Sequence, residues 1–142
     1  MRTLDAEELR AFLLGGTRTA KVGVVRRDGS PLVTPVWFLP DDDGSIMFET
    51  GRESVKGFAL RRDPRVSICV EDDEPPFGFV RIDGVAELSY DLDELRAWTT
   101  RIAARYMGEA HAEEFGRRNA VPSEMLVRVR VSRVVAQVDL TG

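Results

Sequence analysis

The sequence predicts a small, mainly β protein, an antiparallel barrel to which a few helices are added. Six or seven segments have the length and composition of strands, short turns join most of them, and helical segments fall at few points of the chain. Closure of such a sheet removes the exposed strand edges that otherwise favour aggregation. At 142 residues, the chain is expected to form a single domain spanning 1–142.

The strand segments are rich in β-branched residues and are bounded by turn residues. Residues 27–30 form a hairpin turn of the Asp-Gly kind. Pro35 predicts an edge position or a bulge because proline has no N–H for a ladder, and Gly84 predicts a bulge or bend. The predicted strands are residues 20–26, 31–39, 46–50, 65–71, 79–90, 125–131 and 134–140.

Helix starts are marked by capping residues. Asp5 opens a first helix, and Glu8 three residues later completes a capping box. Asp91 caps the longest predicted helix, which runs to about Met107, and a short helix follows at residues 109–118. The apolar stripe of the long helix indicates core packing or a dimer contact and consists of Leu92, Leu95, Trp98, Ile102 and Tyr106.

Charge and composition exclude several classes of function. With 20 basic and 24 acidic residues the net charge is −4, which argues against a nucleic-acid or anionic-membrane partner. No apolar run is long enough to span a membrane and the first residues lack a signal-peptide core, so a cytoplasmic protein is expected. The single cysteine, Cys69, excludes an internal disulfide, and the single histidine, His111, excludes a His-rich metal site. The turn at residues 41–45 carries three aspartates but lacks further calcium ligands at loop spacing, so a solvated turn is favoured and no metal site is predicted.

Residues 48–66 are the most informative segment, because they are strongly basic in an acidic chain. Thr50, Gly51 and Ser54 offer hydroxyls and free N–H groups where a helix begins, and a helix N-terminus favours an anion. Lys56 adds a positive charge, so the segment predicts a cradle for one phosphate. The competing interpretation is that Ser54 only caps a helix whose basic face is solvated. The basic residues are Arg52, Lys56, Arg61, Arg62 and Arg65.

An ordered set of motifs gives the chain a family resemblance. The motifs are Thr34-Pro35-Val36-Trp37-Phe38, Thr50-Gly51 with Ser54-x-Lys56, the run from Leu60 to Val66, Pro76-Phe77, and the run from Val80 to Ala86. In this order they resemble the pyridoxamine 5′-phosphate oxidase-like split-barrel family. The chain is most similar to its actinobacterial branch, which uses the deazaflavin coenzyme F420.

The resemblance implies a six-stranded split barrel that forms a homodimer with two cofactor sites along the dimer interface. It implies that a strand lies against the cofactor ring at Thr34, Pro35, Val36 and Trp37. It implies that the cofactor phosphate is held at Thr50, Gly51, Ser54 and Lys56. It implies that a loop reaches the site across the dimer at Pro76, Phe77, Gly78 and Phe79.

One position departs from the family pattern. Many relatives carry an arginine two residues after the lysine, where this chain has Phe58, so one guanidinium for a phosphate or carboxylate is missing. The missing charge bears on the preference between deazaflavin and FMN, and Arg52 or Lys21 are the candidates to replace it.

Three functions follow from the resemblance. The first is an F420-dependent oxidoreductase that transfers hydride between the deazaflavin and an unsaturated small-molecule acceptor. The second is an FMN-dependent oxidase or flavin reductase. The third is a non-catalytic binder of a cofactor or tetrapyrrole. In the enzymatic cases the cofactor carries the chemistry and the protein supplies position and electrostatics, so no catalytic side chain or proton donor is assigned.

Overall fold

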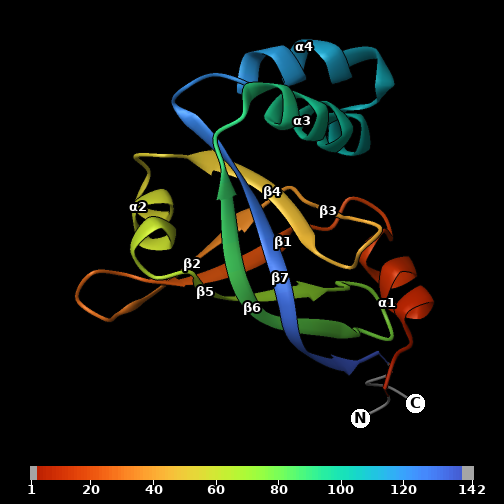
Figure 1. Cartoon of the computed structure of the whole chain (residues 1–142). Coiled ribbons are helices and arrows are strands. Elements are labelled where there is room, and N and C mark those ends of the chain that lie inside the picture. Colours follow the sequence, from red (N-terminus) through yellow and green to blue (C-terminus); the bar gives the residue numbers. More distant parts are fainter. Residues whose placement is uncertain (1–2, 139–142) are drawn as a thin grey trace.

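The computed structural model describes residues 3–138 as one curled sheet with helices around it (Figure 1). The helices are α1 (Ala6–Leu13), α2 (Val55–Arg62), α3 (Leu92–Met107) and α4 (Glu109–Asn119). The strands are β1 (Ala20–Val25), β2 (Pro31–Val36), β3 (Leu39–Pro40), β4 (Ile46–Gly51), β5 (Arg65–Glu71), β6 (Phe79–Ser89) and β7 (Glu124–Gln137). The four predicted helices are therefore confirmed, including the capping box of Asp5 with Glu8 and the cap formed by Asp91.

All the strands pair antiparallel in the order β2-β1-β5-β6-β7-β4-β3. The two edge strands, β2 and β3, are consecutive in the chain and only Trp37 and Phe38 separate them. We call this crossing, Trp37–Phe38, the seam. Within residues 3–138 no ladder joins β2 to β3 or β4, so the expectation of a barrel closed by strand pairing is wrong and the sheet ends meet through the seam.

The sheet has seven strands rather than the expected six, because the predicted strand at residues 31–39 is interrupted. Side chains of α3, and not a neighbouring strand, satisfy the backbone of Phe38. The Tyr106 hydroxyl accepts a hydrogen bond from the Phe38 N–H at 3.3 Å, and the Arg105 guanidinium donates to the Phe38 carbonyl at 2.9 Å. Pairing resumes only at β3, opposite β4. Pro35 lies in the edge strand β2, as its missing N–H predicts.

The last two predicted strands, at residues 125–131 and 134–140, are a single strand, β7, as far as the structure describes them, and residues 139–140 lie outside the described residues. A bulge keeps this strand continuous. Asp83 pairs with Arg133 and Gly84 pairs with Val131, so Ser132 is the extra residue. Its hydroxyl donates to the Asp83 carbonyl at 2.9 Å. The bulge predicted at Gly84 is confirmed, and a side chain there would overlap the Arg130 carbonyl.

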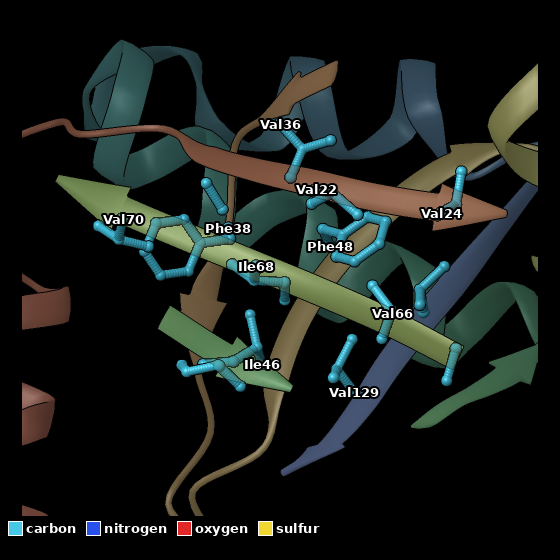
Figure 2. Packing of buried hydrophobic residues seen from close by; sticks show 14 of the residues in the cluster. Val22, Val24, Val36, Phe38, Ile46, Phe48, Val66, Ile68, Val70 and Val129 are labelled. Carbon is cyan, nitrogen blue, oxygen red and sulfur yellow. The ribbon is translucent and has the colours of Figure 1, made fainter. Parts of the chain in front are cut away.

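The inner face of the curled sheet forms the main core (Figure 2). Alternate residues of each strand point inward, as Ala20, Val22 and Val24 do in β1. Phe38 at the seam and Phe48 in β4 are fully buried in the same core. The Phe38 ring therefore packs in the core at the place where the two ends of the sheet meet.

A second, smaller cluster fixes α3 on the outer face of the sheet. Met47 of β4 and Leu126 of β7 pack there against Leu95 and Trp98 of α3. In Figure 1, α3 and α4 lie side by side across one end of the sheet. Of the predicted helical stripe, Leu95, Trp98 and Ile102 are buried, whereas Leu92 is 42% exposed and Tyr106 stacks on Trp37. None of the described helices is long and apolar enough to cross a membrane.

Candidate functional site

A cavity of about 270 Å³ lies where the seam, the outer face of β4 and the α3–α4 pair meet. Alternation along β4 creates its floor. Ile46, Phe48 and Thr50 are buried on the inner side, so Glu49 points to the outer side that faces the helices. We call this cavity the Lys56 pocket. It is lined by Pro35, Val36, Trp37, Glu49, Lys56, Thr99, Ile102, Ala103 and Asn119.

Lys56 enters the pocket from the first turn of α2. Its ammonium donates a hydrogen bond to the Thr34 hydroxyl at 3.0 Å, which ties α2 to the edge strand β2. Burial lowers the pKa of the Lys56 ammonium, and the nearby Glu49 carboxylate opposes that shift. The predicted residues Thr34, Pro35, Trp37 and Lys56 are thus brought together around one cavity or its rim.

Thr50, Gly51 and Ser54 are also close to each other, but in a separate cluster beside the pocket. The Thr50 and Ser54 hydroxyl oxygens are 3.2 Å apart. The Ser54 hydroxyl donates to the Gly51 carbonyl at 2.9 Å and accepts from the Gly57 N–H at 2.9 Å. Ser54 therefore caps α2, as its alternative interpretation predicted, and none of the three residues lines the Lys56 pocket.

Gly57 permits the close approach of α2 to the turn before it. A side chain at this position would overlap the Gly51 carbonyl oxygen. Glycine is therefore required for α2 to lie where Lys56 can reach Thr34.

Sequence reasoning did not select two neighbouring carboxyl groups, Glu49 in the pocket beside Lys56 and Glu124 next to Glu49. Glu49 is half-buried in the pocket, and no hydrogen bond to its carboxyl group is found among residues 3–138. Burial and the neighbouring Glu124 raise the pKa of Glu49 to about 7, against a smaller opposing effect of Lys56. Burial also raises the pKa of Glu124, whose Oε2 atom is buried without a hydrogen-bond partner among the described residues. The available sequence signal for this site was the position of Glu49, a charged residue between Phe48 and Thr50 in a predicted strand.

Trp37 forms the wall of the pocket at the seam. Its indole stacks on the Tyr106 ring of α3, with ring centroids 5.0 Å apart and planes 4° from parallel. The Tyr106 hydroxyl donates to the Arg18 carbonyl at 2.7 Å, which fixes the Tyr106 ring in place beside Trp37. With 41% of its surface exposed, Trp37 is not a core residue, and a flat apolar surface remains at the pocket mouth.

The residues Pro76, Phe77, Gly78 and Phe79 lie apart from this pocket, in the loop that joins β5 to β6 and at the start of β6. Phe77 is 46% exposed. Gly78 is buried so close to the backbone of Val138 that a side chain at this position would overlap it. In a single chain this loop does not line the Lys56 pocket.

The two candidates to replace the missing arginine point elsewhere. The Arg52 guanidinium stacks on the Tyr90 ring at 4.1 Å and donates to the Glu124 carbonyl at 3.2 Å. The Lys21 ammonium donates to the Thr19 carbonyl at 3.4 Å and lies 3.6 Å from the Glu71 carboxylate. Phe58 is 51% exposed and borders a different groove, together with Arg26 and Arg62. Lys56 is therefore the one cation that lines the pocket within the described chain.

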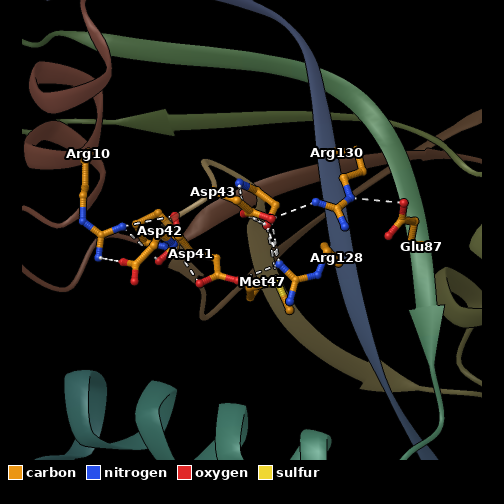
Figure 3. A network of polar contacts seen from close by, with 10 residues as sticks. Arg10, Asp41, Asp42, Asp43, Met47, Glu87, Arg128 and Arg130 are labelled. Carbon is orange, nitrogen blue, oxygen red and sulfur yellow. Dashed lines mark hydrogen bonds and ion pairs between the residues drawn. The ribbon is translucent and has the colours of Figure 1, made fainter.

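The acidic turn at residues 41–45 is part of a network of ion pairs (Figure 3). Arg128 contacts the Asp41 carboxylate at 2.7 Å, and Arg130 contacts the Asp43 carboxylate at 2.7 Å. No group of three or more potential metal ligands occurs in residues 3–138. Of the three aspartates in the turn expected to be solvated, Asp42 is 93% exposed, whereas Asp41 and Asp43 are paired with arginines.

Comparisons with known proteins agree on one family of folds. The family model described as pyridoxamine 5′-phosphate oxidase matches residues 6–137. No match is found among curated proteins. Of the solved structures, the conserved hypothetical protein Rv2991 from Mycobacterium tuberculosis is 28% identical with a TM-score of 0.85, over 98% of this chain and 87% of that one.

Two further structures share the fold at lower identity. A protein named F420 reductase is 21% identical with a TM-score of 0.72, over 94% of this chain and 98% of that one. HutZ, described as the heme storage protein from Vibrio cholerae, is 19% identical with a TM-score of 0.71, over 94% of both chains. At these identities the likeness concerns the fold, and the site has to be argued from its own residues.

Proposed function

This chain belongs to the pyridoxamine 5′-phosphate oxidase family, and from that premise we propose that it is an oxidoreductase dependent on coenzyme F420. In this proposal it transfers hydride between the deazaflavin and an unsaturated small-molecule acceptor. The observation that carries the proposal is the Lys56 pocket, where one ammonium group and the flat Trp37 surface meet at the seam between the sheet ends.

The donors around the pocket fit a single anionic group. Lys56 supplies the positive charge, whereas the Gly57 N–H in the first turn of α2 is already bonded to the Ser54 hydroxyl. The hydroxyls of Thr50 and Ser54 bond to each other and to the turn, so they position α2 and leave the anion to Lys56. One phosphate or one ring anion is therefore the charge that this pocket can balance.

The bound coenzyme would supply the hydride chemistry, and the protein's residues supply everything else. Trp37, held against Tyr106, offers a flat face on which an aromatic ring system stacks. Lys56 offers positive charge toward an anionic ligand in a half-buried site, where electrostatic interactions are stronger than in water. The helices α3 and α4 cover the remaining side and limit access of water.

The dimensions of the pocket support a homodimer. A cavity of about 270 Å³ falls below the range of roughly 300–1,000 Å³ usual for small-molecule sites, so one chain encloses only part of a coenzyme. Val33 and Val85, 63% and 46% exposed, face outward from β2 and β6, and Pro35 at the pocket is on the same face of β2 as Val33. We propose that a second copy covers this apolar face and completes the site with the partner's Phe77 loop.

FMN is the second candidate cofactor, because the family is described by an FMN-type oxidase. Its terminal phosphate dianion carries more charge than the single Lys56 ammonium balances. Phe58 borders a different groove and offers no second cation here, so a phosphate dianion lacks a further charged hydrogen bond, worth roughly 1.5–3 kcal/mol, which favours the deazaflavin. A yellow protein that releases flavin on denaturation would reverse this preference.

A tetrapyrrole is the third candidate, supported by the fold likeness to HutZ. His111 lies exposed on α4 and does not line the Lys56 pocket, so this pocket has no histidine to ligate a haem iron. Tight coenzyme binding without turnover of any acceptor would favour a binding protein over an enzyme.

The proposal is tested by fluorescence titration of the purified protein with F420 and, separately, with FMN. We expect micromolar or tighter binding of F420 and weaker binding of FMN. Lys56→Met should weaken F420 binding by at least about tenfold, because one charged interaction is lost. Lys21→Met is the matched control, since Lys21 is also half-buried but lies outside the pocket, and should change affinity less than about twofold.

Turnover is measured as oxidation of reduced F420 in the presence of quinone-like and conjugated acceptors. Failure of the protein to bind F420 at micromolar concentration contradicts the proposal. Equal losses of affinity in the Lys56 and Lys21 variants would remove Lys56 from the site.

A further inference from the structure

Glu49 is a titratable group in the pocket to which the proposed function gives no role. It lies in the middle of β4, opposite Leu126 of β7, on the outer face that Met47 and Leu126 otherwise make apolar. A glutamate at such a position is unfavourable for folding unless it is paired or neutral. No donor among the described residues forms a hydrogen bond to its carboxyl group, and Glu49 lines the pocket. The carboxyl group is therefore available to a ligand that enters.

The charges that face Glu49 come from two elements. Lys56 of α2 shares the pocket, and Glu124 of β7 acts on Glu49 from the adjacent strand. Glu124 is itself buried at Oε2 without a hydrogen-bond partner in the described part of the chain. The lining residues contributed by β2, α3 and α4 carry no charge. In the pocket itself, one ammonium therefore stands beside one carboxyl group, and Glu124 adds a second negative charge next to Glu49 from outside the pocket.

We propose that Glu49 meets the ligand of the Lys56 pocket as a neutral carboxylic acid, so that an anion enters the pocket together with one proton. This inference rests on the proposed function, since it concerns the same pocket. The protonated carboxyl group donates its O–H to an oxygen or nitrogen of the ligand. Lys56 is then free to balance the ligand's charge, which a charged Glu49 would otherwise neutralise.

The proton balance of this step is simple. Below neutral pH Glu49 already carries the proton, and the anion binds without further uptake. Above it, Glu49 is charged before binding, takes one proton from water or buffer as the anion enters, and returns it on release. Because Glu49 titrates near neutrality with a pKa of about 7, both regimes lie within the range in which a protein is readily studied.

The test measures F420 affinity of the wild-type protein and of Glu49→Gln between pH 6 and pH 8. The wild-type dissociation constant should rise about tenfold over this interval, since ionisation of one group with a pKa near 7 opposes binding. Glu49→Gln resembles the neutral form and should change less than about threefold. Glu53→Gln, at an exposed position in the turn before α2, is the matched control and should follow the wild type.

Proton uptake is measured directly by calorimetry at pH 8 in two buffers that differ in ionisation enthalpy. Wild-type protein should take up close to one proton per F420 bound, and Glu49→Gln close to none. Glu124→Gln should move the wild-type transition to lower pH, because the like charge that opposes ionisation of Glu49 is removed.

Each result decides between the two proposals. Binding of F420 with the same pH dependence and proton uptake in wild type and Glu49→Gln overturns this inference and leaves the proposed function intact. Absence of F420 binding at every pH, in a protein that remains folded, overturns both.

Discussion

The paired strands β4 and β7 carry two clusters of carboxylates and cations on one outer face, and the clusters behave in opposite ways. At one end, the turn before β4 joins Asp41 and Asp43 to Arg128 and Arg130. At the other end, Glu49 lies between the charges of Glu124 and Lys56, both of which act on it. The apolar contact of Met47 and Leu126 with α3 separates them.

The difference lies in how the carboxylates are satisfied. In the turn, hydrogen bonds from Ser45 and contacts with both arginines hold the pKa of Asp43 at about 2. In the pocket, burial without hydrogen bonds raises the pKa of Glu49 to about 7. Carboxylates whose oxygens are all hydrogen-bonded stabilise a fold, whereas a buried carboxylate without a hydrogen-bond partner is typical of a ligand site. Breaking each cluster should therefore change stability in opposite directions.

Arg128→Met should give the largest loss of stability, because Arg128 donates to the Asp41 carboxylate and to the buried Ser45 hydroxyl, both at 2.7 Å. We expect the free energy of unfolding to fall by about 2–3 kcal/mol in urea denaturation at pH 7. Arg130→Met is the control, since Arg130 is about half exposed, and should cost less than about 1 kcal/mol. Equal losses in the two variants would show that the network does not depend on burial.

Glu49→Gln should instead stabilise the protein, by an amount that grows as pH rises above about 4.5 and levels off above pH 7. With a folded pKa of about 7 against 4.5, the native state retains a proton that the unfolded state has lost, so wild-type stability falls as pH rises from 4.5 through 7. After allowance for partial exposure, the variant should gain roughly 1–2 kcal/mol at pH 8 and nothing at pH 4. Urea denaturation at both pH values checks this, and parallel curves for wild type and variant would contradict it.

Asp42→Asn should have the smallest effect, although Asp42 belongs to the same turn as Asp41. Its side chain is 93% exposed and lies 3.4 Å from the Arg10 guanidinium, a geometry in which an ion pair contributes less than about 0.5 kcal/mol. A shift in melting temperature larger than that of Arg130→Met would show that the turn tolerates no loss of charge.

Much of the fold could be predicted because its signals are local. The capping residues Asp5 and Asp91, the edge proline Pro35 and the bulge at Gly84 act through their own backbone. The extra strand β3 could not be predicted in this way. It exists because α3, about seventy residues later, binds the backbone of Phe38 and interrupts the ladder.

The site was predictable in part for the same reason. Lys56 was selected from the basic segment at residues 48–66, the strand at Pro35 was selected through the family motifs, and they meet in the pocket. Glu49 was missed because its raised pKa results from burial beneath α3 and from the charge of Glu124, and both are remote from it in sequence. The homodimer and the role of the Phe77 loop stay predictions, because they concern contacts between chains.

The crossing at Trp37 and Phe38 also affects how wide the curled sheet is. A sheet that closes through two covalently linked residues can widen or narrow without breaking any strand pairing. Here its circumference is fixed by the last turn of α3, where Arg105 and Tyr106 grip the backbone of Phe38. The two ends of the sheet are therefore held together by side chains of a helix, next to the cavity wall that Trp37 provides.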